Sequence, residues 1–125
     1  MIILAAAGLA HTAWPADSWR VIDGDTVVVN GETVRLARID APEIRGHCAS
    51  EKRLARAAKA RMVELMAGGK IRVERGYKGR MKDRHRRTLG RVYVGDTDVG
   101  EVLIQEGLAR PWRGRRAPWC SGATQ

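Results

Sequence analysis

The fold of this chain is decided by residues 26–43, which read Thr26-Val-Val-Val-Asn-Gly-Glu-Thr-Val-Arg-Leu-Ala-Arg-Ile-Asp-Ala-Pro-Glu43. Asn30-Gly31 is a tight-turn dipeptide that lies between two apolar, β-branched runs. Such a dipeptide supplies the positive φ angles that a two-residue hairpin turn requires. We therefore expect Thr26–Asn30 and Thr33–Ile39 to pair as a β-hairpin.

On either side of this hairpin, the spacing of apolar residues predicts further strands and two helices. The strands are expected at Trp19–Asp23, Lys70–Glu74 and Leu89–Val94, and the helices at 50–66 and 98–106. No internal repeat is visible, and 125 residues are a usual length for one domain. Short strands and two helices in this order indicate an α+β, mainly β domain, built as a five-stranded Greek-key barrel.

The longer predicted helix has start and stop signals of its own. Ser50 is suited to the N-cap, and Glu51 suits the positive end of the helix dipole. Gly68-Gly69 is expected to end the helix. Its apolar residues recur at helical spacing and are expected to face the core, as a stripe of Leu54, Ala58, Met62 and Leu65. In the second helix, Asp98 is the expected N-cap and Gly107 the expected C-cap.

The chain is strongly basic, with 23 Lys and Arg residues against 14 Asp and Glu residues and a formal net charge of +9. A charge of this sign favours polyanionic partners, nucleic acid first and an acidic membrane surface second. The alternative is a basic but otherwise ordinary soluble protein. No feature points to an obligate protein partner, and no apolar run reaches the roughly 20 residues of a transmembrane anchor.

Residues 1–16 begin with the apolar stretch Met1–Ala10 and continue with small residues up to Ala16. This pattern is similar to the hydrophobic part of a secretory signal, although a basic start is missing. The alternatives are an apolar arm that packs on the domain and an anchor on a membrane surface. We set residues 1–16 apart and treat 17–125 as one domain. A secreted or periplasmic (envelope) location is expected, with a cytoplasmic location as the alternative.

The two cysteines, Cys48 and Cys120, permit one disulfide in an exported chain. The alternative is that both cysteines are free thiols. The cysteines lie far apart in the sequence, and the three histidines are scattered, so the chain has no zinc-binding pattern.

The polar residues around the hairpin are suited to chemistry on a phosphate group. Asp25 and Asp40 offer oxygen ligands for Ca²⁺ or Mg²⁺. Glu43 can act as a general base, and Arg35 can hold a phosphate through two parallel hydrogen bonds. Arg35 and Asp40 differ by an odd number, so on a regular strand they would face opposite sides. They can share a site only if the strand bulges or ends between them, and Pro42 makes an early end credible.

These carboxylates have simpler explanations, namely a calcium-binding loop of another type or an ordinary turn. Asp23-Gly-Asp25 is not an EF-hand loop, because the sixth position lacks Gly and the twelfth position is Val34 rather than Glu. Asp23-Gly24 by itself is usually only a turn. The prediction of a phosphate site depends on the hairpin. The hairpin would bring the acidic residues Asp23 and Asp25 close to Asp40 and Glu43.

Two basic segments lie downstream of the hairpin. Lys78–Arg87 is either a solvated loop or a contact surface for a phosphate backbone. The segment Arg110–Arg116 mixes arginines with Trp112, which either stacks on a splayed base or closes the edge of the core.

Four collinear strings make the chain resemble the staphylococcal nuclease (thermonuclease-like) family. They are Ile22–Val27, Arg35-Leu36 with Ile39–Glu43, Asp83 with Arg87, and Val99–Ala109, and together they cover roughly Trp19 to Trp112. The resemblance implies an OB-fold barrel and calcium-dependent cleavage of DNA and RNA at the 5′ P–O bond, which leaves 3′-phosphate ends.

The resemblance also implies roles for individual residues. Asp25, Asp40 and the main-chain carbonyl of Ala41 would be Ca²⁺ ligands. Glu43 would be the general base, and Arg35 and Arg87 would clamp the scissile phosphate. The remaining positions are supporting residues or nucleic-acid contacts: Asp23 and Asp83 in the first group, and Arg84, His85, Arg86 and Trp112 in the second.

The chain departs from the family pattern in the string Asp83-Arg-His-Arg-Arg87, where His85 replaces a tyrosine and Arg86 replaces a glycine. Spacing from Asp83 favours Arg87 over Arg86 as the residue that enters the site. Two hypotheses follow. The first is a secreted, calcium-dependent nuclease without preference between DNA and RNA. The second is a non-catalytic OB-fold module that binds nucleic acid with the same basic face.

Overall fold

The computed structural model describes residues 17–121. Its strands are β1 (Trp19–Asp23), β2 (Thr26–Val29), β3 (Glu32–Leu36), β4 (Ile39–Asp40), β5 (Ile71–Arg75), β6 (Thr88–Val94), β7 (Thr97–Asp98) and β8 (Arg110–Pro111). Its helices are α1 (Ala49–Met66) and α2 (Val99–Gln105). The fold is mostly β with two helices, consistent with the predicted OB-like α+β class. Within residues 17–121, no helix is long and apolar enough to cross a membrane.

The predicted hairpin is confirmed and forms the centre of the main sheet. β2 and β3 pair antiparallel from Thr26 opposite Arg35 to Val29 opposite Glu32. Asn30 and Gly31 have φ angles of 50° and 83°, as a two-residue turn of this kind requires. The sheet has the order β1-β2-β3-β6-β5, in which β3 and β6 run parallel, and β7 pairs with β6. Parallel pairing carries the loop that precedes β6 to the edge of the hairpin.

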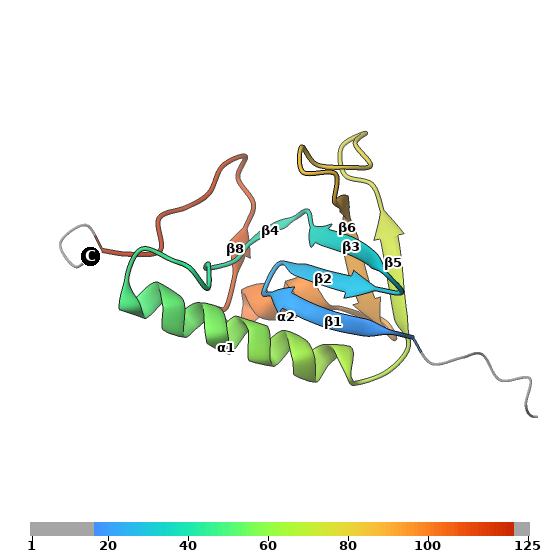
Figure 1. Cartoon of the computed structure of the whole chain (residues 1–125), viewed down its shortest axis with the longest axis horizontal. Coiled ribbons are helices and arrows are strands. Elements are labelled where there is room, and N and C mark those ends of the chain that lie inside the picture. The colour runs from blue at the N-terminus through green and yellow to red at the C-terminus, as the bar shows by residue number, and fades with distance from the viewer. Residues whose placement is uncertain (1–16, 122–125) are drawn as a thin grey trace, which may run out of the picture.

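The core lies between this sheet and the two helices. Figure 1 shows α1 along the β1 side of the sheet, with α2 behind it. The side chains with the least exposure come from both layers, and include Val27, Val34, Val92, Met62, Met66, Val99 and Leu103. Burial of an aliphatic side chain of this size is worth about 1.5–3 kcal/mol, so these residues fix the sheet against the helices.

Closure of a five-stranded barrel was expected, and it is not observed. β4 leaves the main sheet and pairs antiparallel with β8, which places Ile39 opposite Pro111 and Asp40 opposite Arg110. These two strands form a separate small sheet, so the barrel stays open. β8 was not predicted, because two residues that include a proline show no strand periodicity.

The expected break between Arg35 and Asp40 is confirmed. β3 ends at Leu36, Ala37 and Arg38 form a turn, and β4 begins at Ile39. The turn removes the alternation that would have placed the two side chains on opposite faces.

The limits of α1 differ from those predicted. The N-cap is Cys48 rather than Ser50, and it makes no side-chain capping bond. Leu54 and Leu65 are only partly buried, whereas Ala55 and Met66 are buried. The buried face is therefore rotated slightly from the predicted stripe. In α2 the prediction was correct, because Asp98 caps the helix by accepting hydrogen bonds from the backbone of Gly100 and Glu101.

Gly90 allows β5 and β6 to cross closely. A Cβ atom at this position would lie 2.3 Å from the carbonyl oxygen of Glu74, so no larger residue fits without backbone movement. Gly90 also pairs with Leu36 across the parallel β3–β6 ladder.

A disulfide joins Cys48, at the start of α1, to Cys120. The bond ties the segment that follows β8 to the loop that follows Glu43. The Met1–Ala10 stretch, with its expected signal or arm, lies outside the described residues.

Candidate active site

A cavity of about 530 Å³ opens where the β1–β2 turn, the end of β3 and the loop before β6 meet. Most of the predicted site residues line it, namely Asp23, Asp25, Arg35, Glu43, Asp83, Arg84, His85, Arg87 and Trp112. Arg86 does not line it; that residue is exposed and has a φ angle of 66°. Asp40 and Ala41 are buried beside the cavity.

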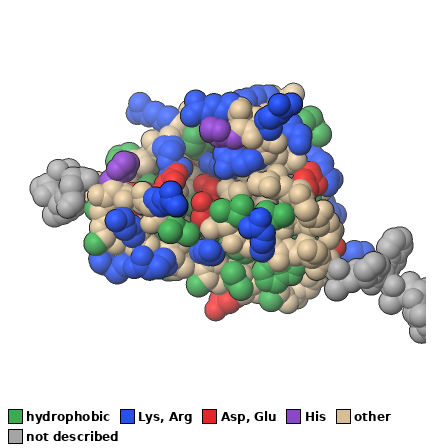
Figure 2. Space-filling view, viewed as in Figure 1, with side chains coloured by type: hydrophobic (Ala, Val, Ile, Leu, Met, Phe, Trp, Pro, Cys, Tyr) green, Lys and Arg blue, Asp and Glu red, His purple; other side chains and the backbone are tan. Residues whose placement is uncertain are grey.

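Charges of both signs meet at this cavity. Figure 2 shows Lys and Arg side chains gathered over the loops between β5 and β6, with acidic side chains just below them near the centre of the face. Cations beside recessed carboxylates suit a phosphate group that is held together with a metal ion.

Arg35 and Asp25 face each other at the rim. Arg35 Nη2 lies 3.5 Å from Asp25 Oδ2, and the two side chains are only 12% and 9% exposed. Arg35 Nη1 donates to the carbonyl oxygens of Leu36 and Ile39, the latter at 3.0 Å. Asp25 Oδ1 accepts a hydrogen bond from the Thr26 hydroxyl at 2.8 Å. The guanidinium group is therefore held in a fixed orientation by the turn that separates β3 from β4.

Asp23 lies next to this pair. Its Oδ1 accepts a hydrogen bond from the backbone N–H of Asp25 at 3.2 Å. Burial, together with the neighbouring carboxylate of Asp25, raises the pKa of Asp23 to about 7. Two acidic groups this close disfavour simultaneous ionisation, so a cation beside them is favoured.

Arg87 is oriented by Asp83. Arg87 Nε donates to Asp83 Oδ2 at 2.7 Å, and the Arg87 backbone N–H donates to Asp83 Oδ1 at 2.9 Å. Burial acts to raise the pKa of Asp83, but these hydrogen bonds and one from the His85 backbone lower it below its usual value. Asp83 therefore stays charged and holds Arg87 at the entrance of the cavity.

Asp40 and Ala41 supply buried oxygen atoms to the site. Asp40 is 1% exposed, and although no donor among residues 17–121 makes a well-aligned hydrogen bond to its Oδ1, the Arg116 guanidinium lies 3.2 Å from that oxygen. A buried carboxylate is costly unless a cation lies beside it, so this position requires either Arg116 or another cation. Carboxylate oxygens such as those of Asp40 and Asp25, and a carbonyl oxygen such as that of Ala41, are hard donors of the type that Ca²⁺ and Mg²⁺ prefer. The chemistry of these residues therefore fits the implied divalent cation.

The loop that carries Glu43 is held by Glu51, a residue whose role the sequence did not reveal. Glu51 is 4% exposed and accepts hydrogen bonds from the backbone N–H groups of Glu43 and His47, both at 3.0 Å. Burial acts to raise the pKa of Glu51, but these two bonds lower it below its usual value. A Cβ atom on Gly46 would lie 2.4 Å from Glu51 Cδ, so a larger residue there would displace the Glu51 side chain from these hydrogen bonds. An acidic residue in the first turn of a helix signals only a dipole partner.

Arg116 is the second residue that sequence reasoning missed. Its guanidinium group contacts Asp40 and Glu43 at 3.2 and 3.0 Å and donates to the carbonyl of Ala41 at 2.9 Å. It lies in the segment that was expected to stack on bases, and its sequence neighbourhood contains no local partner. Long-range packing alone brings it to the acidic residues.

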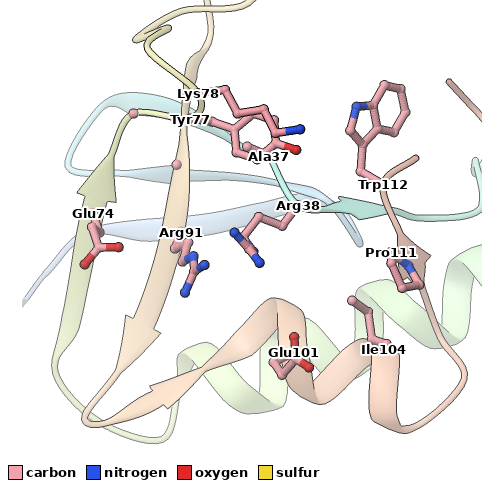
Figure 3. A pocket seen from close by; sticks show the side chains of 12 residues that line it. Ala37, Arg38, Glu74, Tyr77, Lys78, Arg91, Glu101, Ile104, Pro111 and Trp112 are labelled. Carbon is pink, nitrogen blue, oxygen red and sulfur yellow. The ribbon is translucent and has the colours of Figure 1, made fainter. Parts of the chain in front are cut away.

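A second cavity, of about 610 Å³, adjoins the first, and Ala37, Tyr77 and Trp112 line both. Figure 3 shows Arg38 and Arg91 directed into it, with Tyr77 and Trp112 near one rim. The Arg35 guanidinium lies 5.7 Å from the centre of the Trp112 ring. Trp112 is therefore positioned between the two cavities and is only partly buried.

One cluster near the site is not a metal centre, although its atoms lie close together. Cys48, Glu51 and Cys120 have potential ligand atoms within 4.8 Å of one another. Because the two sulfurs are bonded to each other, neither is a thiolate that could bind a metal.

The family model described as "Staphylococcal nuclease homologue" matches residues 33–121. Endonuclease YncB of Bacillus subtilis (strain 168) is 40% identical over 95 residues, which are 73% of this chain and 44% of that protein. The SPbeta prophage-derived endonuclease YokF of the same organism is 39% identical, over 73% of this chain and 32% of the relative.

The thermonuclease of Staphylococcus intermedius is 35% identical over 95 residues, which are 73% of this chain and 55% of that protein. This chain thus spans between about a third and just over half of the relatives' length. The family match extends from the hairpin to the segment after β8, and includes Arg35, Asp40, Glu43 and Arg87. This chain belongs to the staphylococcal nuclease homologue family.

Proposed function

We propose that this protein is a metal-dependent nuclease that hydrolyses phosphodiester bonds in nucleic acid. One observation carries the proposal: Asp25, Arg35, Glu43 and Arg87, which come from separate segments, line the same cavity. The two relatives from Bacillus subtilis are named endonucleases, and the staphylococcal relative is named a thermonuclease.

Two arginines bind the phosphate in this proposal. Arg35 is held by the carbonyls at the end of β3, and Arg87 is held by Asp83. A guanidinium group donates two parallel hydrogen bonds to phosphate oxygens, which a lysine cannot do. Because both groups are oriented before substrate arrives, they stabilise the charge that develops in the five-coordinate transition state.

Glu43 is the general base. Its side chain is half exposed and lies at the cavity, and Glu51 holds its loop through the backbone. A carboxylate in this position accepts the proton of the attacking water molecule.

Asp25, Asp40 and the carbonyl of Ala41 would hold the divalent cation, and the oxygen donors and the family resemblance favour Ca²⁺. When bound, a cation of this type would supply stabilisation of the negative charge that develops during phosphodiester hydrolysis. The resemblance further implies that DNA and RNA are both cut at the 5′ P–O bond, with 3′-phosphate ends.

The second cavity provides space for nucleotides that flank the scissile phosphate. Arg38 is exposed at this cavity and can contact a neighbouring phosphate, while Tyr77 and Trp112 offer rings for base stacking. The disulfide between Cys48 and Cys120 supports an oxidising location, and we propose that the protein works outside the cytoplasm.

The test is digestion of plasmid DNA and of RNA, with Ca²⁺ and with a chelator. We expect cleavage of both substrates that requires the cation. Glu43→Gln should lower turnover by about 10²-fold or more, because general-base catalysis typically contributes 10²–10⁴-fold. Nucleic-acid affinity should change little. The matched control is Glu64→Gln, which removes an exposed carboxylate remote from the cavity.

The outcomes separate the two hypotheses. Unchanged turnover in the Glu43→Gln protein would remove the general-base role. Binding with a steep dependence on salt concentration, but without cleavage under any condition, would favour the non-catalytic binding module.

A further inference from the structure

We propose that the C-terminal strap, residues 110–120, carries a built-in competitor for the divalent cation. In the closed state Arg116 occupies the oxygens of Asp40, Ala41 and Glu43, and the cation must displace it. This inference rests on the proposed function, since it takes Asp40 and Ala41 as cation ligands.

The contacts of Arg116 coincide with the predicted site. One nitrogen, Nη1, lies 3.2 Å from Asp40 Oδ1 and 3.0 Å from Glu43 Oε2. The other, Nη2, donates to the carbonyl oxygen of Ala41 at 2.9 Å. A guanidinium group and a divalent cation cannot both occupy the space directly against these oxygens. The two are therefore alternatives for the same negative charge.

The strap is anchored on both sides of Arg116. Before it, β8 pairs with β4, and Arg110 donates to the carbonyl of Pro118 at 2.7 Å and lies 3.8 Å over the Trp119 ring. After it, the backbone N–H of Ala117 donates to Asp40 Oδ2 at 2.7 Å, and Cys120 is bonded to Cys48. Anchors of this kind keep the effective concentration of Arg116 at the site high.

The burial of the residues that contact Arg116 favours its replacement by a cation over its departure without a replacement. The Arg116 and Glu43 side chains are 40% and 50% exposed, and an ion pair of this exposure contributes little. The Asp40 side chain is 1% exposed, so leaving it without a cation would be costly. Arg116 therefore leaves readily only when another cation takes its place at Asp40.

This arrangement lowers the apparent cation affinity. If the strap is closed for about nine-tenths of the time, the apparent Kd rises about tenfold. Loss of the Cys48–Cys120 bond would lower the effective concentration of Arg116 and shift the balance toward the open state. The disulfide thus couples cation affinity to oxidation of the two thiols.

The test is calorimetric titration of the full chain with Ca²⁺, without nucleic acid. Arg116→Ala should bind Ca²⁺ about tenfold more tightly than the unmodified protein. The matched control is Arg115→Ala, which removes the same charge from the adjacent exposed residue. Arg115 makes no hydrogen bond or ion pair within the described part of the chain, so its removal should change the Kd by less than about twofold.

A second pair of variants tests the tether. Replacing both cysteines by serine should tighten Ca²⁺ binding when Arg116 is present and should have no effect in the Arg116→Ala protein. An Arg116→Ala Kd that matches the Arg115→Ala Kd, or is weaker, would overturn the inference. Absence of Ca²⁺ binding in every variant would overturn it together with the cation assignment. Tighter binding in a protein that cleaves no nucleic acid would overturn the proposed activity alone.

Discussion

Arg35 is held in one orientation by its neighbours, which suits the phosphate-binding role proposed for it. Its guanidinium group is held by two backbone carbonyls and by Asp25, so little side-chain entropy remains to be lost when a phosphate binds. The turn at Ala37-Arg38 is what makes this possible, because it brings the carbonyl of Ile39 back within reach of Arg35. The odd spacing of Arg35 and Asp40 is therefore resolved by the same turn that orients Arg35.

Glu51 acts at the same scale through Glu43. We predict that Glu51→Gln lowers turnover about tenfold or more while nucleic-acid affinity stays within about twofold. An amide has one acceptor oxygen, so one of the two backbone N–H groups of the Glu43 loop loses its partner. Steady-state kinetics measure the turnover, and binding assays measure the nucleic-acid affinity.

A purely structural role for Glu51 would leave turnover unchanged while lowering stability, by about 1–3 kcal/mol for one unsatisfied buried group. Ser50→Ala provides a matched control, since it alters an exposed neighbour in the same turn of α1. Full turnover in a destabilised Glu51→Gln protein would show that Glu51 supports the fold and does not position Glu43.

At the scale of elements, Glu32 links three strands of the main sheet. Its carboxylate accepts hydrogen bonds from Arg75 on β5, at 2.9 and 2.5 Å, and from the Thr88 hydroxyl on β6, at 2.7 Å. These hydrogen bonds, from Arg75 first, lower the pKa of Glu32 to about 2. The carboxylate therefore stabilises the sheet in its charged form.

We predict that Glu32→Gln lowers the free energy of unfolding by up to about 1 kcal/mol at pH 7, a value reduced for the exposure of Arg75. Because the folded-state pKa lies below the ordinary 4.5, this stabilisation is complete above pH 4.5. It should be lost as the pH falls from 4.5 toward about 2. Urea unfolding at pH 7, 4 and 3 measures the difference between the two proteins.

The control for this prediction is Glu74→Gln, whose partner Arg72 lies 3.7 Å away and whose side chain is 55% exposed. Its removal should change stability less at every pH, because an exposed ion pair contributes little. If the difference in free energy of unfolding between the unmodified and the Glu32→Gln protein stays constant from pH 7 to pH 3, protonation of Glu32 does not control this stabilisation.

At the scale of the whole molecule, the disulfide closes a long covalent loop of the described chain. Cys48 and Cys120 are 72 positions apart, so the bond restricts the unfolded chain strongly. We predict that reduction lowers the free energy of unfolding by about 2–4 kcal/mol. Guanidinium chloride unfolding with and without a phosphine reductant measures this loss.

The variant in which both cysteines are replaced by serine serves as the control, since the reductant should not alter its unfolding midpoint. An identical midpoint for the oxidised and reduced forms of the unmodified protein would contradict the prediction. It would mean that the Cys48–Cys120 bond contributes nothing to global stability.

Local patterns were sufficient for several elements of this molecule. Asn30-Gly31 specified a turn, Asp98 specified the start of α2, and the break before Asp40 followed from strand parity. In each case the neighbouring residues are enough to determine the local structure, because turn and cap geometries depend on a few adjacent φ and ψ angles. Ser50 was wrong as the predicted N-cap, because α1 begins at Ala49 after Cys48, which makes no side-chain capping bond.

The sequence by itself determined the hairpin, both helices and a set of acidic and basic residues suited to a phosphate site. Only the tertiary structure decided that the barrel stays open, that Glu51 holds the Glu43 loop and that Arg116 lies against Asp40. The reason is physical: periodicity and turn chemistry act between near neighbours, whereas these contacts join residues whose distance depends on how the whole chain packs.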